Sequence, residues 1–256
     1  MRHDQVNFRV IEETADWIVI DKPAGLLVHP TKPGGPPTLW DGLRELLAYE
    51  IVNKGQISLI NRLDRETSGI VLVCKNPVSA RTFAMAMEDG RIKKTYHALV
   101  YGWPAENTFT ITSPLLRIGE KEPSKIWLKR GIHADGDFSE TVVEVLERRQ
   151  TADKKTFSLV LARPLTGRTH QIRVHLASVG HSVIGDKIYG PDEMLYLRFI
   201  DEGWTAEMEK ILWLPRHALH SSTLEAQIHD ATYRWETSLP LDMEKMLKES
   251  GLCPRP

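Results

Sequence analysis

The stretch SLINRLDRETSGIVLV, residues 58–73, places a polar loop between two apolar runs. The apolar residues on either side have the length and β-branched content of strands, so the stretch predicts strand, loop and buried strand. Asp64 lies in the loop between Arg62 and Arg65. A loop held at both ends by strands can expose a side chain while its position stays defined, which suits chemistry. We therefore take Asp64 as a candidate functional residue.

Six segments have strand patterns, and several alternate apolar and polar residues, as TFSLVLA does at 156–162. The six are 17–20, 57–60, 70–74, 95–101, 141–146 and 157–162. Strands outnumber helices and do not alternate regularly with them. This pattern favours an α+β fold, with a mixed, mainly antiparallel sheet flanked by helices and loops, over a doubly wound parallel sheet.

Two helices are predicted before residue 95. TLWDGLRELLAYEI, residues 38–51, places four leucines on one stripe. They are Leu39, Leu43, Leu46 and Leu47. NPVSARTFAMAMEDG, residues 76–90, begins with Asn76 as N-cap and Pro77 at the first helical position, and it ends at Gly90.

A third helix is predicted in THQIRVHLASVG, residues 169–180, which opens with Thr169 and ends at Gly180. Its inward side chains are expected to be Ile172, Leu176 and Val179. His170 and Arg173 would share the face that this stripe leaves uncovered. The five-residue spacing of His170 and His175 does not suit two metal ligands on one helical face, so no metal site is predicted.

The composition is that of an ordinary globular protein: 256 residues, 41% hydrophobic and 26% charged. No repeat or linker divides the chain, which predicts one domain over 1–256, possibly with two lobes. Cys74 and Cys253 have no paired spacing, and the charged N-terminus shows neither a signal peptide nor a membrane span. We therefore expect a reducing cytoplasm.

The net charge of −1 argues against nucleic-acid binding by bulk electrostatics. Charge is unevenly placed, however, since residues 163–175 hold three arginines, two histidines and no acid, and such a patch can bind phosphate. Two loop-rich segments are predicted as insertions, 117–139 and 191–216, the second with a short helix around AEMEKILWL. Either could face a substrate or decorate the surface.

The common cofactor and nucleophile signatures are missing from the sequence: there is no Gly-rich phosphate loop, dinucleotide fingerprint, HExxH or GxSxG. A reaction would therefore use side chains without a cofactor. If the helix at 169–180 faced Asp64, Arg173 would keep that carboxylate ionised by a charge-assisted hydrogen bond.

Four segments together resemble the motifs of the RluA family of pseudouridine synthases, in the order and spacing of that family, over residues 16–225. They are DKPAGLLVHP (21–30), NRLDRETSG (61–69), KKTYHALVYG (93–102) and RPLTGRTHQIRVHLASVGHSVIGDKIYG (163–190). The resemblance implies a pseudouridine synthase catalytic domain that detaches a uridine from its ribose in RNA, rotates it and rejoins it through carbon 5. It also implies that no cofactor takes part.

The resemblance carries roles to matching positions. It implies that Asp64 is the catalytic aspartate, that Arg173 pairs with it and that Tyr96 stacks on the target base. It implies that Arg62 fills the gap in the RNA stack left by the flipped nucleotide. These roles agree with the cost of extruding a base, which a stacked aromatic ring and an inserted cation can offset. Arg168 and Lys187 are predicted phosphate contacts.

The chain departs from the family pattern at Asn61, where the family motif usually begins with His. We expect this difference to affect the position of the loop or its contacts with RNA. The first catalytic-domain strand is expected near Trp17, which leaves no room for the S4 RNA-binding domain of many relatives. We therefore expect recognition of a structured tRNA or rRNA stem-loop by the catalytic domain's own loops, and a monomer.

Two alternatives stay open on the sequence. The first is a catalytically silent or chaperone-like RNA-binding protein on the same fold. The second is a hydrolase in which Asp64 cleaves the glycosidic bond and free base is released. Glycosidases usually use two carboxylates, and Glu66 is the nearest second carboxylate in the sequence.

Overall fold

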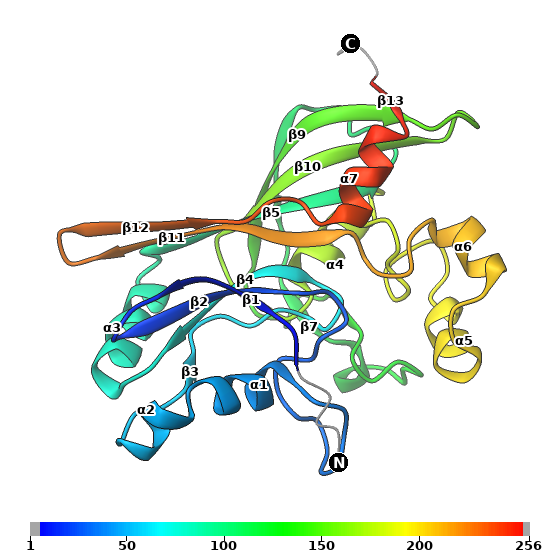
Figure 1. Ribbon diagram of the computed structural model, residues 1–256. Helices are drawn as coiled ribbons and strands as arrows, with labels where there is room; N and C mark the ends of the chain where they lie inside the picture. The colour runs from blue at the N-terminus through cyan, green and yellow to red at the C-terminus, as the bar shows by residue number, and fades with distance from the viewer. Residues whose placement is uncertain (1–5, 253–256) are drawn as a thin grey trace. The chain divides into compact units, whose positions relative to one another are not determined.

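The structure, a computed structural model, describes residues 6–252, and its helices and strands are drawn in Figure 1. The chain forms two compact units. Unit 1 comprises Met1–Lys94 with Ser221–Ser238, and unit 2 comprises Thr95–His220 with Leu239–Pro256. The prediction of one domain over 1–256 stays a prediction. Cys253 lies outside the described residues, and Cys74 is a buried free thiol whose pKa burial raises to about 11.

Unit 1 is a sheet with helices. Its strands are β1 (Arg9–Glu13), β2 (Trp17–Lys22), β3 (Ser58–Leu59), β4 (Ser68–Cys74), β12 (Ala231–Glu236) and most of β11 (Leu219–Ile228). Its helices are α1 (Leu39–Leu46), α2 (Ala48–Val52) and α3 (Pro77–Glu88). The strand order is β1-β2-β4-β11, with β3 paired to β4 and β12 to β11. The pairs of β4 with β2 and β3 are antiparallel, and the strand–loop–strand prediction for 58–73 is confirmed.

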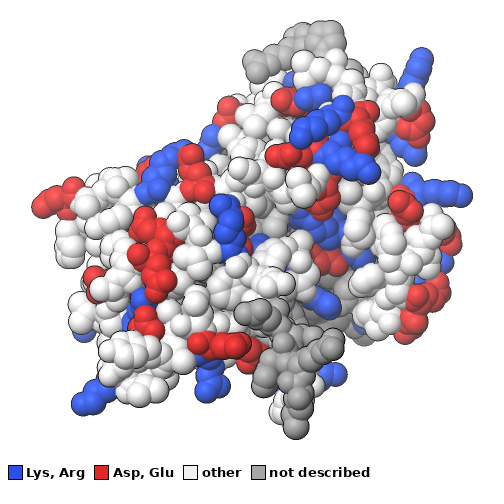
Figure 2. Space-filling model, viewed as in Figure 1, with Lys and Arg blue, Asp and Glu red and all other residues white. Residues whose placement is uncertain are grey.

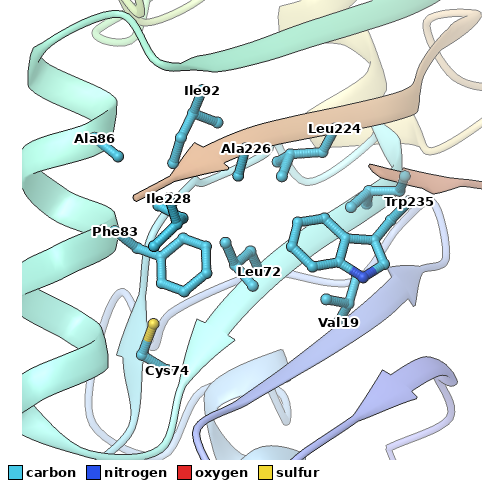
Figure 3. Close-up of a cluster of buried hydrophobic side chains, with 11 residues drawn as sticks. Val19, Leu72, Cys74, Phe83, Ala86, Ile92, Leu224, Ala226, Ile228 and Trp235 are labelled. Carbon is cyan, nitrogen blue, oxygen red and sulfur yellow. The ribbon is translucent and has the colours of Figure 1, made fainter. Parts of the chain in front are cut away.

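The core of unit 1 lies between α3 and the sheet, as Figure 3 shows. Phe83 and Ala86, three residues apart on α3, point to the same side and meet Leu72 and Cys74 of β4. The predicted start and stop of this helix are confirmed: the Asn76 side chain accepts a hydrogen bond from the Ser79 N–H at 2.9 Å, and the helix ends before Gly90. Helix α3 thereby buries one face of β4, the strand that follows the Asp64 loop.

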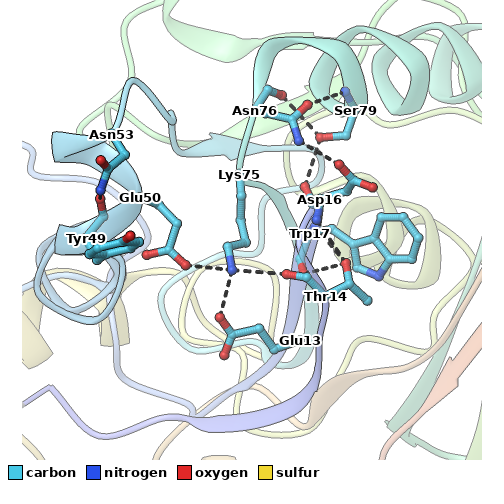
Figure 4. Close-up of polar contacts among 10 residues, drawn as sticks. All are labelled: Glu13, Thr14, Asp16, Trp17, Tyr49, Glu50, Asn53, Lys75, Asn76 and Ser79. Atoms are coloured by element: carbon cyan, nitrogen blue, oxygen red, sulfur yellow. Dashed lines mark hydrogen bonds and ion pairs between the residues drawn. The ribbon is translucent and has the colours of Figure 1, made fainter.

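A buried lysine ties β4 to its neighbours in unit 1 (Figure 4). Lys75 Nζ lies 2.8 Å from a Glu13 carboxylate oxygen and 2.7 Å from one of Glu50, and it donates to the Thr14 carbonyl at 3.0 Å. Burial alone would lower the pKa of Lys75, but the two carboxylates outweigh it and the pKa is raised. The ammonium therefore stays charged and holds β1 and α2 against the end of β4.

Unit 2 contains the longest strands. Its strands are β5 (Ile92–Tyr101, from Thr95 on), β6 (Thr108–Thr112), β7 (Leu115–Arg117), β8 (Arg130–Ile132), β9 (Glu140–Gln150), β10 (Thr156–Pro164) and β13 (Gly251–Leu252). Its α-helices are α4 (Gln171–Ser178), α5 (Met194–Glu202), α6 (Ala206–Leu212) and α7 (Leu241–Lys248), and a 3₁₀ turn spans Ile118–Glu120. The order β5-β10-β9-β13 is antiparallel, β6 pairs with β9, and β7 with β8 forms a separate two-stranded sheet.

These elements confirm the α+β prediction, and each of the six predicted strands is present: β3 is shorter than the predicted 57–60, and the other five run longer than predicted. The helix predicted around AEMEKILWL is α6, while α5 and α7 were not predicted. No helix in the described part of the chain, residues 6–252, is long and apolar enough to cross a membrane. On the face drawn in Figure 2, basic and acidic side chains are interspersed, as the net charge of −1 leads one to expect.

Two helix predictions need correction. The single helix expected over 38–51 is two helices, because the chain turns at Leu47, whose φ of −98° and ψ of 27° are not helical. Leu46, at the edge of the predicted stripe, is exposed, whereas Leu39, Leu43 and Leu47 are buried. The buried stripe thus consists of three of the four predicted leucines and does not include Leu46.

The helix predicted at 169–180 is shorter and has no free polar face. It is capped at His170, which has a left-handed φ of 59°, and not at Thr169, and it ends at Ser178, so Val179 is exposed rather than inward. Arg173 and His175 are buried. The amphipathic argument fails here because the polar side chains of α4 meet polar partners inside unit 2.

His175 shows how such a partner set works. Its Nε2 lies 3.2 Å from the Ser113 carbonyl oxygen, which can only accept, so Nε2 carries the hydrogen. Its Nδ1 lies 2.9 Å from the Thr141 hydroxyl, and Ser139 Oγ lies 2.9 Å from Nε2. Both ring nitrogens are therefore engaged by partners inside unit 2. Burial lowers the pKa of His175, although the Ser113 contact opposes the shift.

This burial predicts that acid destabilises the protein. Below about pH 6.5 the unfolded chain takes up a proton at His175 that the folded chain does not, so the free energy of unfolding falls as the pH falls, by at most about 1.4 kcal/mol per pH unit for one group. Urea unfolding between pH 7.5 and 5 should show a shallower pH dependence for His175→Gln than for wild type. His133→Gln is the control, because the His133 side chain is 41% exposed. Equal slopes for the two variants would contradict the prediction.

Candidate active site

Asn61, the first residue of the Asp64 loop, attaches the loop to β4. The Asn61 side chain is buried, its Nδ2 donates to the Ile70 carbonyl at 2.9 Å and its Oδ1 accepts from the Leu72 N–H at 2.9 Å. One amide thus takes the place of two backbone partners next to β4. The residue that departs from the family pattern therefore supports the loop from within.

The other side of the loop is attached to the segment after β2. Lys22 is fully buried, and its ammonium donates to the carbonyl oxygens of Pro23, Leu26 and Arg65 at 2.9, 2.9 and 3.1 Å. Gly25 N–H also donates to the Arg65 carbonyl at 2.8 Å. Residues 23–26 and the loop are therefore joined by several bonds at Arg65, directly after Asp64. Asp64 itself is half-buried.

Gly69, the second residue of β4, is required by a close approach. Its φ is +113°, and a Cβ built there would lie 2.2 Å from the carbonyl oxygen of Ser221 on β11. A side chain would push β4 and β11 apart, and an L-residue would be strained at this φ. The glycine therefore lets β4 start immediately after the loop.

The Asn61 contacts predict a stability loss. Asn61→Ala leaves the buried Ile70 carbonyl and Leu72 N–H without this partner, and each such group costs about 1–3 kcal/mol, so urea unfolding should show a loss within or above that range. Asn53→Ala is the matched control, because its amide makes one exposed hydrogen bond, to the Tyr49 carbonyl. Equal stability of the two variants would show that the Asn61 amide does not support the loop.

In unit 2, Arg173 of α4 pairs with Asp186. Nε and Nη2 of Arg173 donate to the two carboxylate oxygens at 2.6 and 2.9 Å, and both side chains are buried. Asp186 Oδ1 also accepts the N–H groups of Ile188 and Tyr189 at 3.0 Å. Burial favours the neutral acid, but the Arg173 charge and these bonds outweigh it and hold the pKa of Asp186 well below its usual range. The guanidinium is thereby fixed in orientation.

Tyr189 extends this arrangement. The guanidinium of Arg173 lies over its ring, with Cζ 4.9 Å from the ring centroid. The Tyr189 hydroxyl accepts the Arg130 N–H at 2.8 Å and lies 2.7 Å from His170 Nδ1. Tyr189 thus links Arg130, at the start of β8, to His170, which caps α4. Its ring also contacts Arg173 of the Arg173–Asp186 pair.

The remaining predicted residues of unit 2 are placed differently. Tyr96 is buried on β5, opposite Ala162 of β10. Arg168 is exposed, its Nε donates to the Phe138 carbonyl at 3.3 Å and a terminal nitrogen lies 3.5 Å from Asp137. Lys187 is buried, donates to the Pro215 carbonyl at 2.6 Å and lies over the ring of Phe199. Its ammonium is thus engaged inside unit 2, and its role as a phosphate contact stays a prediction.

The structure brings Arg62 and Asp64 together on one loop of unit 1, with Arg62 exposed. Tyr96, Arg168, Arg173 and Lys187 belong to unit 2. The pairing of Asp64 with Arg173 stays a prediction. Sequence reasoning missed Asp186 and Lys22. Both stand in quoted motifs, GDKIYG and DKPAGL, but neither motif by itself indicates that the charged side chain is buried.

The comparison with protein families identifies the family of this chain. The family model described as RNA pseudouridylate synthase matches residues 16–178, which include Asp64, Tyr96 and Arg173. The chain belongs to this family. The predicted RluA-type pseudouridine synthase membership is confirmed, since relatives include large-subunit pseudouridine synthases of bacterial ribosomes.

Two curated relatives and one solved structure illustrate the likeness. An uncharacterized RNA pseudouridine synthase of Aquifex aeolicus is 31% identical over 77% of this chain and 62% of its own length. The ribosomal large subunit pseudouridine synthase D of Nitrosomonas europaea is 33% identical over 96% of this chain and 66% of its own. The chain thus spans less than two thirds of either relative. The human RNA pseudouridylate synthase domain containing 4 protein has the same fold, with a TM-score of 0.71 at 22% identity, covering 94% of this chain and 92% of that one.

The described residues offer no metal centre. No group of three or more His, Cys, Asp or Glu side chains between residues 6 and 252 is placed to hold an ion. The chemistry available on the loop of unit 1 is that of the Asp64 carboxylate and the exposed Arg62, together with the backbone that positions them.

Proposed function

We propose that this chain is an RNA uridine isomerase that converts uridine to pseudouridine at Asp64. The observation that carries the proposal is the family match over residues 16–178, which contains Asp64 in a loop held on both sides by Asn61 and Lys22. A carboxylate held in this way can act on a base without a cofactor.

The reaction exchanges two bonds of one nucleotide. The bond from uracil N1 to ribose C1′ breaks, and a bond from C5 to C1′ forms; C5 gives up its proton and N1 gains one, so no atom is gained or lost overall. Asp64 would act as nucleophile or base. Tyr96 would stack on the base, and Arg62, which is exposed beside Asp64, would enter the RNA stack in place of the extruded nucleotide.

Arg173 would support the ionised form of Asp64. Asp186 uses two of the five N–H donors of the guanidinium and fixes its plane. We propose that a further N–H of the Arg173 guanidinium donates a hydrogen bond to Asp64. Because the buried Asp186 carboxylate holds the guanidinium in place, Arg173 would not have to reorient to bind the Asp64 carboxylate. It would thus stabilise the ionised form of Asp64 by preorganised electrostatics.

The proposed substrate is a structured RNA stem-loop. Ribosomal RNA is favoured by the name of the Nitrosomonas europaea relative, a ribosomal large subunit pseudouridine synthase. Transfer RNA is the second candidate, because the balanced surface charge suits a small folded target better than long non-specific binding.

Tritium release tests the proposal. The full chain is incubated with tRNA and, separately, with rRNA, each carrying uridine tritiated at carbon 5, and released tritium and free uracil are measured. Release of tritium without free uracil supports isomerisation, and the responding RNA names the substrate class. Free uracil would instead indicate a glycosidase. Binding of either RNA with no release would indicate a silent RNA-binding protein.

A further inference from the structure

An unusual pair of arginines stands on the two-stranded sheet of unit 2. In the antiparallel register of β7 and β8, Arg117 lies directly opposite Arg130. Like charges at directly opposed positions destabilise a sheet. Arg117 Nη1 and Arg130 Nε are both buried without a hydrogen-bond partner. Glu120 neutralises only one of the two charges, by accepting from Arg117 Nε at 3.1 Å. The pair therefore carries an excess positive charge and unused donors, which an anion would relieve.

An exposed aromatic ring lies on the same segment. Trp127 is 71% exposed, and the Arg117 guanidinium covers one face of its ring, with Cζ 3.7 Å from the ring centroid. The cation fixes the ring in place, while most of the remaining ring surface is in solvent. A large, exposed and immobilised indole is a platform on which an unpaired base can stack.

Buried neighbours hold this segment against α4. Ile126, which precedes Trp127, packs in one apolar cluster with Leu115 of β7, Val174 of α4 and Tyr189. The Arg130 N–H donates to the Tyr189 hydroxyl at 2.8 Å, and the Tyr189 ring lies under the Arg173 guanidinium. The arginine pair is therefore two contacts away from the arginine to which we give a role in the reaction.

We propose that Arg117, Arg130 and Trp127 form a nucleotide-binding site for the RNA substrate. A backbone phosphate binds between the two guanidiniums, and the adjoining unpaired base stacks on the open face of Trp127. RNA is the occupant because it supplies, in one ligand, the anion that the arginines lack and the flat ring that fits the indole. The inference rests on the proposed function, since it assigns segment 117–139 to that same substrate.

The experiment is an RNA-binding titration with its salt dependence. Fluorescein-labelled tRNA and a labelled rRNA stem-loop are titrated with the full chain, as wild type and as Arg117→Gln, Arg130→Gln and Trp127→Ala. Lys125→Gln is the matched control: it removes an exposed positive charge from the same segment. Urea unfolding of each variant confirms that it folds.

Each arginine variant should bind about 3- to 10-fold more weakly and lose about one unit from the slope of log affinity against log salt, because one phosphate contact is gone. Trp127→Ala should bind about tenfold more weakly with an unchanged slope, and Trp127→Phe should restore part of the affinity. In tritium release, the same variants should raise KM and leave kcat at saturating RNA near wild type.

Affinities and slopes equal to those of Lys125→Gln would overturn the inference. Because binding is measured without turnover, the two proposals fail separately. Loss of affinity in the three variants with no tritium release from any form of the protein would support this site and contradict the isomerase. Tritium release with unchanged affinities would do the reverse.

Discussion

Asp64→Asn is expected to abolish tritium release, lowering kcat by at least about 10³-fold, within the range that acid–base groups supply. Asparagine has the same shape as aspartate but cannot act as nucleophile or base at neutral pH. Asn61 and Lys22 support the loop through bonds to Ile70, Leu72 and the loop backbone, so the substitution should leave the fold in place. RNA affinity should remain within a few-fold of wild type.

Asp89→Asn is the matched control, because Asp89 is an exposed carboxylate in unit 1 that forms an ion pair with Arg91 at the surface. Exposed pairs contribute about 0–1 kcal/mol, so its turnover and stability should equal those of wild type. Full activity in Asp64→Asn would remove Asp64 from the mechanism. Equal inactivity in both variants would point to a defect in the assay or the preparation.

Asp186→Asn is expected to cost about 3–5 kcal/mol of unfolding free energy, the largest stability effect predicted for this chain. The variant removes the carboxylate that meets the buried Arg173 guanidinium inside unit 2, and asparagine cannot accept both N–H groups of the guanidinium as a carboxylate does. Urea unfolding measures the loss. Because the pKa of Asp186 is depressed, its contribution in wild type is present at neutral pH and is lost progressively as the pH falls below about 4.

Asp242→Asn provides the comparison, since Asp242 accepts from Arg216 in the same two-bond geometry, at 2.6 and 2.8 Å, but is one-third exposed. Water can replace part of that interaction, so its loss should be about 1–2 kcal/mol. The double variant Arg173→Met with Asp186→Leu should recover much of the stability and none of the activity. An Asp186→Asn loss no larger than that of Asp242→Asn would contradict the buried-pair account.

Local signals predicted the elements that depend on local chemistry. Asn76 and Gly90 marked the ends of α3 because capping and left-handed termination involve residues within one turn of each other. The apolar run after Gly69 indicated β4 because a strand buried on both faces is apolar throughout. The loop with Asp64 followed from the same two runs.

Pairings between distant residues were not predictable in this way. Helix α4 looked two-faced because Arg173 was placed on the face that the apolar stripe leaves uncovered. In the structure, Asp186 meets Arg173 and the Ser113 carbonyl meets His175, both inside unit 2. Nothing within one turn of Arg173 indicates a carboxylate thirteen residues later. Asn61 looked like a departure from a family pattern, and only its bonds to β4 show that it supports the loop.

The sequence by itself determined the α+β class, the position of the Asp64 loop and, through its motifs, the pseudouridine synthase family, because these depend on residue order and short-range spacing. Only the tertiary structure decided which charges meet partners inside the protein. Three carbonyl oxygens accept from Lys22, and Asp186 pairs with Arg173. Arg117 and Arg130, in contrast, each keep a buried nitrogen without a hydrogen-bond partner. The reason is physical. Removal of a charge from water costs several kcal/mol unless a partner meets it, and chain folding, not spacing along the sequence, places that partner.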